Sequence, residues 1–469
     1  MVGSASACPV QEREYVRFEI VDFNGRALSK TVPARHKASP VFMYVGAAAF
    51  GANSEITTFP EEVAATGFPN AELVPDWSTE QVLPWAARPG AKVSRVYCEQ
   101  RWGSEKLRTL PRTLCARMLQ ELRMHQGHGY EIFIGGEQEF TFVKPSEDGC
   151  GWKPLFTGVD VFATLQNAKS MDLCYEIERH MESVGVDILT INAEYGEGQV
   201  ELAFAPKFGL EACDMLATFR TGTKEIAQSH GLLASFFTRP FGVDGVGSGG
   251  HFNFSIWRPD GAGRASGPDA ISRATADRAN AFHDADDVEG LSLMARQFLA
   301  GVLAHAPAIE AICSPTPACY TRHGHWAPSV ANWGLDDRMA AVRVKADKEG
   351  SGRGCYMELR MPSAAANTYL VTAAVLAGGL DGLRRGLKLP PARQTKEDGA
   401  RELPTSLEDA LAALEADAYM VDKLGADFVR WYAGVKRAEL KAINDRVAKG
   451  SGSNEELSVA WQHAYLEFI

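Results

Sequence analysis

Two glutamates occupy alternate positions in a segment that is otherwise apolar enough to be buried. The segment IFIGGEQEFTFV spans residues 132–143. Read as a strand with a period of two residues, it places Ile134 and Phe140 on one face and Glu137 and Glu139 on the other. Neighbouring buried carboxylates repel each other unless a cation neutralises them. This face therefore predicts a site whose chemistry depends on a positive charge.

Four further segments have the same arrangement, with apolar side chains on one face and polar ones on the other: GQVELAFAP, HFNFSIW, AAVRVKA and YMELRM. They could be ordinary amphipathic strands with solvated outer faces. Their polar faces, however, are dominated by Glu, His and Arg and are flanked by glycine, so we favour convergence on one site. A glycine-rich turn, NAEYGEG, adds a further carboxylate. The candidate side chains beyond the first segment are Glu194, Glu201, His251, Asn253, Ser255, Arg343, Glu358 and Arg360.

The donor types indicate which cation such a site would hold. Carboxylates with a single imidazole favour Mg²⁺ or Mn²⁺ over zinc. Arginines on neighbouring strands suit reactions of phosphate groups, because guanidinium groups stabilise phosphoryl charge. The usual phosphate motifs are absent: no Gly-x-x-x-x-Gly-Lys-Ser/Thr occurs, and GVGSGG at 245–250 precedes a predicted strand rather than a helix.

The elements that must position these residues change in character along the chain. Residues 13 to about 100 contain short β-type segments separated by Gly, Pro and polar turns. From about 105, segments with helical periodicity alternate with strands, which predicts an α+β fold. We expect an amino-terminal domain at 13–105 and a second domain at 106–469. The uncharged stretch 362–380 is interpreted as a buried helix with its lead-in, not a membrane span.

Composition excludes several classes of function. The 469 residues are 45% hydrophobic and 23% charged, with a net charge of −11, which argues against binding nucleic acid or a membrane surface. The nine cysteines include no Cys-x-x-Cys pair, so neither a disulfide framework nor a zinc site is expected. The first residues lack the pattern of a signal peptide, and a reducing, cytoplasmic location fits best.

Five motifs, in this order, give the sequence a family resemblance: GGEQEF, NAEYGEGQVEL, GSGGHFNFS, NWGLDDRMAAVRV and MELRMPSAAANTYLVTAAVLAGGLDGL. From about residue 13 to the end the chain resembles the glutamine synthetase family, in particular its lengsin-like class I branch. The resemblance implies a small β-grasp amino-terminal domain and a larger catalytic domain with a curved antiparallel sheet flanked by helices. It also implies a homo-oligomer, a dodecamer of two hexameric rings with active sites between subunits.

The resemblance assigns roles to particular residues. It implies two or three Mg²⁺ or Mn²⁺ ions per site, the first held by Glu139, Glu194 and Glu201 and the second by Glu137, His251 and Glu358. Arg338 would be a catalytic residue that acts on the phosphoryl group during its transfer. The nucleotide would be contacted by Arg343, Asn253 and Ser255, and glutamate by Arg322, Arg360 and Gly247.

The implied reaction is the ATP-dependent joining of glutamate to an amine through a γ-glutamyl phosphate. The chain departs from the family pattern at Trp326 of GHWAP, where ammonia-using members carry a glutamate, and in FGANSEI, which has no Asp. The acceptor could thus be ammonia or, given Trp326, a larger amine or polyamine, since an indole can hold a cation but cannot act as a base. The alternative is a non-catalytic, lengsin-like assembly protein that keeps the ring fold. Retention of all six ligand positions favours catalysis, because unpaired buried carboxylates are costly.

Overall fold

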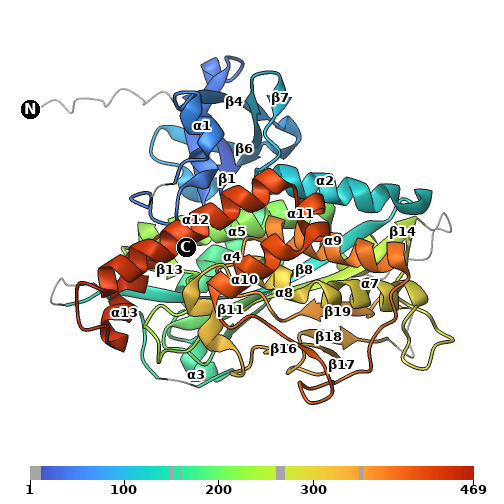
Figure 1. Cartoon of the computed structure of the whole chain (residues 1–469). Helices are drawn as coiled ribbons and strands as arrows, with labels where there is room; N and C mark the ends of the chain where they lie inside the picture. The colour runs from blue at the N-terminus through green and yellow to red at the C-terminus, as the bar shows by residue number, and fades with distance from the viewer. Residues whose placement is uncertain (1–11, 57, 148–150, 159, 260–269, 348–351) are drawn as a thin grey trace, which may run out of the picture.

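Two main sheets make up the β-structure of the computed structural model. The structure describes residues 12–56, 58–147, 151–158, 160–259, 270–347 and 352–469. The smaller sheet belongs to the amino-terminal part of the chain. Figure 1 shows it in blue, above a larger body of strands and helices. The expected α+β fold, with a small amino-terminal sheet and a larger curved one, is confirmed.

The small sheet has the strand order β2-β1-β6-β4-β3, with β5 and β7 also paired to β6. Strand β1 pairs antiparallel with β2 and parallel with β6, and the short helix α1 precedes β4. The elements are β1 (Arg13–Val21), β2 (Ala27–Pro33), β3 (Val41–Tyr44), α1 (Glu61–Ala65), β4 (Asn70–Pro75), β5 (Gln81–Val82), β6 (Ala91–Trp102) and β7 (Glu105–Lys106).

The large sheet follows the path β10-β11-β8-β14-β19-β18-β17, and β9, β12, β13 and β15 pair along its sides. All neighbours on the path are antiparallel except β17 and β18. Its strands are β8 (Glu131–Pro145), β9 (Trp152–Pro154), β10 (Ile188–Ala193), β11 (Gln199–Phe204), β12 (Lys207–Phe208), β13 (Leu233–Ser235), β14 (Gly250–Pro259), β15 (Arg278–Asn280), β17 (Trp333–Leu335), β18 (Val342–Lys345) and β19 (Tyr356–Leu359). A separate pair joins β16 (Val330–Ala331) to β20 (Arg401–Glu402).

The five segments with carboxylate- or arginine-bearing faces are therefore β11, β8, β14, β19 and β18, which are consecutive in the sheet. The apolar face of β8 is fully buried, with Ile132, Ile134, Phe140 and Phe142 all at 0% exposure. Helix α5 (Gly209–Ser229) packs on that face, where a Cβ on Gly136 would lie 3.2 Å from the methyl groups of Leu216. The polar face of β8 is consequently the one left for a site.

The remaining helices surround the large sheet and connect it to the small one. Figure 1 shows α2 and α12 between the small sheet and the rest of the molecule. The helices are α2 (Pro111–Met124), α3 (Thr164–Asn167), α4 (Met171–Ser183), α6 (Ala270–Ala274), α7 (Leu293–Ala304), α8 (Ala306–Cys313), α9 (Thr368–Arg385), α10 (Leu407–Ala416), α11 (Ala418–Leu424), α12 (Ala426–Val447) and α13 (Asn454–Trp461).

The uncharged stretch 362–380 forms most of α9, as expected. The Asn367 side chain caps the helix by accepting from the Tyr369 N–H, and the helix ends at Gly386, whose φ of 60° is left-handed. All residues from Tyr369 to Gly382 are buried within the protein. In the part of the chain that the structure describes, no helix has the length and apolar character needed to cross a membrane.

A buried ion pair on α12 joins the small sheet to the large body. Lys436 and Glu439 are both inaccessible to solvent, with Nζ 3.1 Å from Oε2. The other carboxylate oxygen of Glu439 accepts hydrogen bonds from the Asn24 side chain at 2.9 Å and the Ala52 N–H at 2.8 Å. The hydroxyl of Tyr465, near the end of the chain, donates to Oε2 at 3.2 Å. One carboxylate thus connects segments far apart in sequence.

Replacing that carboxylate predicts a large loss of stability. Glu439→Ala leaves the buried Lys436 charge without a carboxylate, with only the Asn24 side chain as acceptor, and we expect the free energy of unfolding to fall by about 3–5 kcal/mol. Asp445→Ala, on the same helix, removes an exposed partner of Lys441 and should cost less than about 1 kcal/mol. Urea unfolding of both variants checks this, and equal losses would contradict the structural role of Glu439.

Candidate active site

The register of the large sheet places the predicted ligands side by side. Glu201 of β11 lies directly opposite Glu139 of β8, and His251 of β14 lies opposite Glu137 of β8. On the other side of β14, Asn253 is paired with Glu358 of β19. Because cross-strand partners share a face of the sheet, these residues converge.

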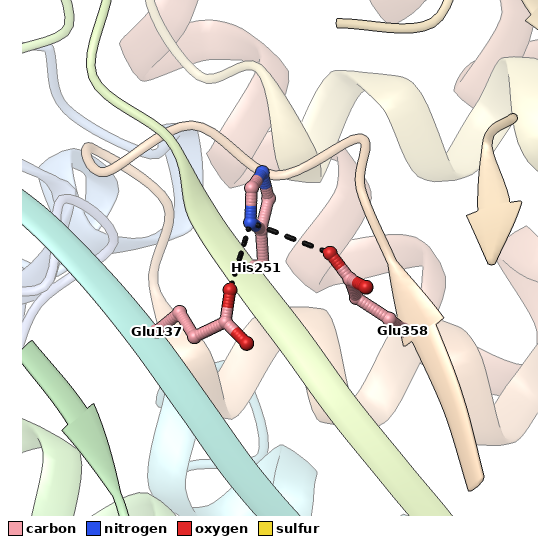
Figure 2. Close-up of side chains that lie close together, drawn as sticks. All are labelled: Glu137, His251 and Glu358. Carbon is pink, nitrogen blue, oxygen red and sulfur yellow. Dashed lines mark hydrogen bonds and ion pairs between the residues drawn. The ribbon is translucent and has the colours of Figure 1, made fainter. Parts of the chain in front are cut away.

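Two overlapping groups of these side chains have the geometry of cation sites. The first comprises Glu137, His251 and Glu358, and the second Glu139, Glu201 and His251, with donor atoms within 4.8 Å of one another in each group. Figure 2 shows the imidazole between two carboxylates, with His251 Nδ1 3.2 Å from Glu137 Oε2 and 3.5 Å from Glu358 Oε1. Carboxylates with one imidazole are donors suited to Mg²⁺ or Mn²⁺.

Glu194 lies at the edge of this cluster, on the turn between β10 and β11, and belongs to neither group. Its Oε1 accepts from the Asn192 side chain at 3.1 Å. Burial and the nearby Glu139 charge raise the pKa of Glu194 to about 7. Burial, followed by the charges of Glu139 and Glu137, raises the pKa of Glu201 to about 9. The carboxylates are therefore close enough to repel each other strongly, and a divalent cation among them would remove the repulsion.

Glu137 is the exception in this cluster. Burial alone would raise its pKa, but hydrogen bonds from His251 and Asn253 outweigh that effect and hold the pKa at about 2. The Asn253 amide donates to Glu137 Oε1 at 3.1 Å, and its own Oδ1 is buried without a hydrogen-bond partner among the described residues. Glu137 is thus held as an anion, available to a cation at neutral pH.

Arginines border the cluster on the β18 and β19 side. Arg343 Nη1 donates to Glu358 Oε2 at 3.0 Å, and its Nε donates to Asp336 Oδ1 at 2.8 Å. Arg360, which is buried, donates to Glu358 Oε1. Arg338 is exposed, and its positive charge acts on Glu194. Three of the predicted arginines therefore lie at or near the carboxylates.

The loop before β14 passes close to both Arg322 and the same cluster. A Cβ added at Gly249 would lie 3.0 Å from Glu139 Oε1, 3.1 Å from Arg322 Nη2 and 3.2 Å from His251 Nε2. A Cβ at Gly247 would lie 2.6 Å from Arg322 Cγ. These positions require glycine because the side chains of three separate elements meet there. The glycine run at 245–250 is therefore a place where the backbone passes close to the cluster.

Comparison with known proteins shows the family of the chain. The family description "Glutamine synthetase, catalytic domain" matches residues 108–451. The chain belongs to the glutamine synthetase family. The glutamine synthetases of this family are ATP-dependent ligases, and this chain is a glutamate–amine ligase of that type.

Curated members of the glutamine synthetase family match the chain over most of its length. Lengsin of Canis lupus familiaris is 29% identical over 91% of this chain and 71% of its own. Glutamine synthetase of Halobacterium salinarum is 30% identical over 91% and 90%. Glutamate–methylamine ligase of Methyloversatilis universalis is 29% identical over 88% and 89%. The solved structure titled "GmaS/ADP complex-Conformation 1" has a TM-score of 0.75 and 27% identity, over 93% of this chain and 95% of that one.

Two predicted residues lie apart from the carboxylates of this glutamine synthetase fold. Trp326 follows Arg322 on a loop, has a left-handed φ of 63° and is 60% exposed. Its indole has no hydrogen bond or ring contact with any described residue. Ser255 is buried two positions beyond Asn253 on β14. Its hydroxyl accepts a hydrogen bond from the indole N–H of Trp257 at 2.8 Å.

Sequence reasoning overlooked two residues that hold the predicted ones in place. The buried Gln199 side chain donates to Glu139 Oε2 at 2.8 Å and accepts from the Gly196 N–H at 2.6 Å. Asp336 orients the guanidinium of Arg343. The period-two pattern contained a signal for Gln199, because it lies two residues before Glu201 on the same face of β11.

The cluster predicts that divalent cations stabilise the protein more as the pH rises. Without metal, the folded protein keeps protons on Glu194 and Glu201 that the unfolded chain releases near pH 4.5, so its stability should fall between about pH 5 and 9. A cation competes with these protons. We therefore expect Mg²⁺ or Mn²⁺ to raise the melting temperature more at pH 8.5 than at pH 6.5, relative to EDTA.

Matched variants test whether the cluster is responsible. Glu201→Gln should lose most of the metal-dependent rise and its pH dependence, whereas Glu182→Gln, an exposed carboxylate on α4, should keep both. An unchanged metal effect in Glu201→Gln would contradict the assignment of the cluster as the cation site.

Proposed function

We propose that this chain joins glutamate to an amine larger than ammonia, through a γ-glutamyl phosphate made from ATP. The observation that supports the ligase chemistry most strongly is the convergence of four glutamates and one histidine on one face of the sheet, with Glu194 at the edge and arginines alongside. The site suits phosphoryl transfer to a carboxylate, because such reactions need charge neutralisation more than covalent catalysis.

The residues present fit a site with two or more divalent cations. Of the proposed ligands, Glu137, His251 and Glu358 would hold one ion, and Glu139, Glu194 and Glu201 another. Such ions would neutralise phosphate oxygens of ATP. The raised pKa values of Glu194 and Glu201 support the fit, because they reflect burial and, after it, neighbouring negative charge that lacks a counter-ion.

The arginines have distinct proposed tasks. Arg338 is exposed and forms no hydrogen bond or ion pair with the described residues, so its guanidinium is available to the transferring phosphoryl group. Arg343, fixed by Glu358 and Asp336, would bind ATP phosphates together with Asn253 and Ser255 at the nucleotide. Arg322 and Arg360, both buried, would bind the carboxylates of glutamate. Gly247 would allow glutamate to approach the backbone.

The acceptor is inferred from two sequence departures. Trp326 stands where ammonia-using members carry a glutamate, and the 50–56 loop has no Asp. An exposed indole can bind an alkylammonium group through cation–π contact, but it cannot take a proton from ammonium. The relative named glutamate–methylamine ligase supports a larger amine as the acceptor.

Further features belong to the same proposal. We propose that the chain divides into domains at 13–105 and 106–469 and assembles as a dodecamer of two hexameric rings. The similarity to lengsin keeps a second candidate, a non-catalytic assembly protein. Seven described cysteines are free and buried, which supports a reducing, cytoplasmic location.

An amine panel separates these candidates. With ATP, glutamate and Mg²⁺, we expect phosphate release to be fastest with alkylamines or polyamines and slow with ammonium. The reason is that Trp326 stands in place of the glutamate that could deprotonate ammonium. Phosphate release measured over this panel checks the prediction. Fast release with ammonium alone would contradict the proposed acceptor, and silence with every amine would favour the assembly protein.

Trp326 predicts a specific kinetic change. Trp326→Ala should raise the KM for the preferred amine roughly 3- to 30-fold, the range expected for losing one cation–π contact, and leave the KM for ATP unchanged. Trp326→Glu should shift the preference toward ammonium. As a control, Trp77→Ala removes an exposed tryptophan from the small sheet and should alter neither value. An unaltered amine KM in Trp326→Ala would exclude the indole from the amine pocket.

A further inference from the structure

A cavity of about 360 Å³ lies where the small sheet, α5 and the end of the chain meet. It is lined by the β1–β2 turn at 25–28, by one side of α5, by β13 and by Glu467 and Phe468. Helix α5 packs on the apolar face of β8, whereas the proposed catalytic carboxylates occupy the other face. The cavity is therefore separated from the candidate active site by the sheet.

Two arginines line this cavity with part of their hydrogen-bonding capacity unused. Arg220 is only 7% exposed, and its guanidinium lies 5.0 Å from the ring centre of Phe236. Its Nη1 donates to the carbonyl of Ala364 at 3.0 Å, but its Nη2 is buried without a partner among the described residues. Arg26 donates from Nε to Asp22 at 2.7 Å, and its Nη2 is also unpartnered. A buried donor without an acceptor is costly, and an anion that accepts from both guanidinium groups would remove this cost.

A third cation, Lys224, lies one turn along α5 from Arg220. It is partly buried and forms no hydrogen bond or ion pair with the residues that the structure describes. Burial, reinforced by the charges of Arg220 and Arg26, lowers the pKa of Lys224 to about 7. Three basic groups thus face one small space.

Each acidic group nearby has a partner other than Lys224, although the charges of Asp22 and Glu467 also act on Lys224. Glu225 forms an ion pair with Arg17 at 2.5 Å and accepts a hydrogen bond from the indole N–H of Trp85 at 2.8 Å. Glu467 accepts a hydrogen bond from the indole N–H of Trp152 at 2.9 Å. Asp22 is fully buried and is held by Arg26. The positive charge at the cavity therefore exceeds the negative charge that faces it.

We propose that this cavity binds a small metabolite through a phosphate or carboxylate group, held by Arg220, Lys224 and Arg26. Guanidinium groups match the planar fork of both oxyanions, and the lysine amine adds a hydrogen-bond donor. The cavity is larger than a single oxyanion, so the rest of the metabolite would lie toward Leu233 and Phe468. None of the proposed catalytic residues takes part, so the site stands or fails independently of the ligase activity.

Pyridoxal 5′-phosphate is a direct probe of this site. Its phosphate would bind the arginines while the Lys224 amine attacks its aldehyde and releases water, and borohydride then reduces the imine to a stable label. Peptide mass spectrometry of the full-length protein at pH 7.5 should show Lys224 labelled at least several-fold more than the exposed Lys388. Stronger protection by inorganic phosphate than by succinate would indicate a phosphate ligand, and the reverse a carboxylate ligand. Labelling of Lys224 no greater than that of Lys388, or unaffected by either anion, would overturn the proposal.

A variant tests binding without labelling. Lys224→Met removes no hydrogen bond or ion pair with a described residue, so it should fold like the wild type. Inorganic phosphate should raise the melting temperature of the wild type and of Lys388→Met more than that of Lys224→Met. Any phosphate bound at the catalytic site contributes equally to all three proteins. Equal shifts in all three would also overturn the proposal.

Discussion

Repulsion between carboxylates on neighbouring strands is the constraint that governs this protein. Glu137, Glu139 and Glu201 are brought together by the register of β8 and β11, and burial makes their charges costly. A sheet would not tolerate such a face without a counter-charge. Arg343, Arg360 and His251 supply only part of it, which leaves the cluster suited to divalent cations and to the phosphates that they accompany.

The rest of the fold keeps this face rigid and open. Helices α5 and α9 contribute to the buried core, so the sheet can present its other face to substrates. Glycines at 247 and 249 let the loop before β14 pass close to Arg322 and the cluster. The small sheet is tied to the body through Glu439, and the 50–56 loop is fixed through the Ala52 N–H. Cation binding, loop placement and the joining of the two sheets are thus linked by short, buried polar contacts.

Much of this was predictable from sequence, for a physical reason. Alternation in the five segments is strong because one face is buried, so strands and faces followed directly. The assignment of Glu137, His251 and Glu358 to one ion came with the family resemblance, whereas the order of the strands and the pairing of His251 with Glu137 are seen only in the structure. Short strands such as β12 and β13 carry too few residues for a periodic signal. The basic cavity was not foreseeable, because Arg26 and Arg220 are brought together only by tertiary packing.

The central claim is that the acidic face holds divalent cations, and direct counting of bound ions tests it most sharply. Mn²⁺ titration of the metal-free protein, followed by electron paramagnetic resonance of the free ion, gives the number of ions per chain. The account predicts at least two tightly bound ions, in line with the two donor groups, and a loss of binding in Glu137→Gln. Absence of tight binding, or binding that Glu137→Gln leaves intact, would contradict it.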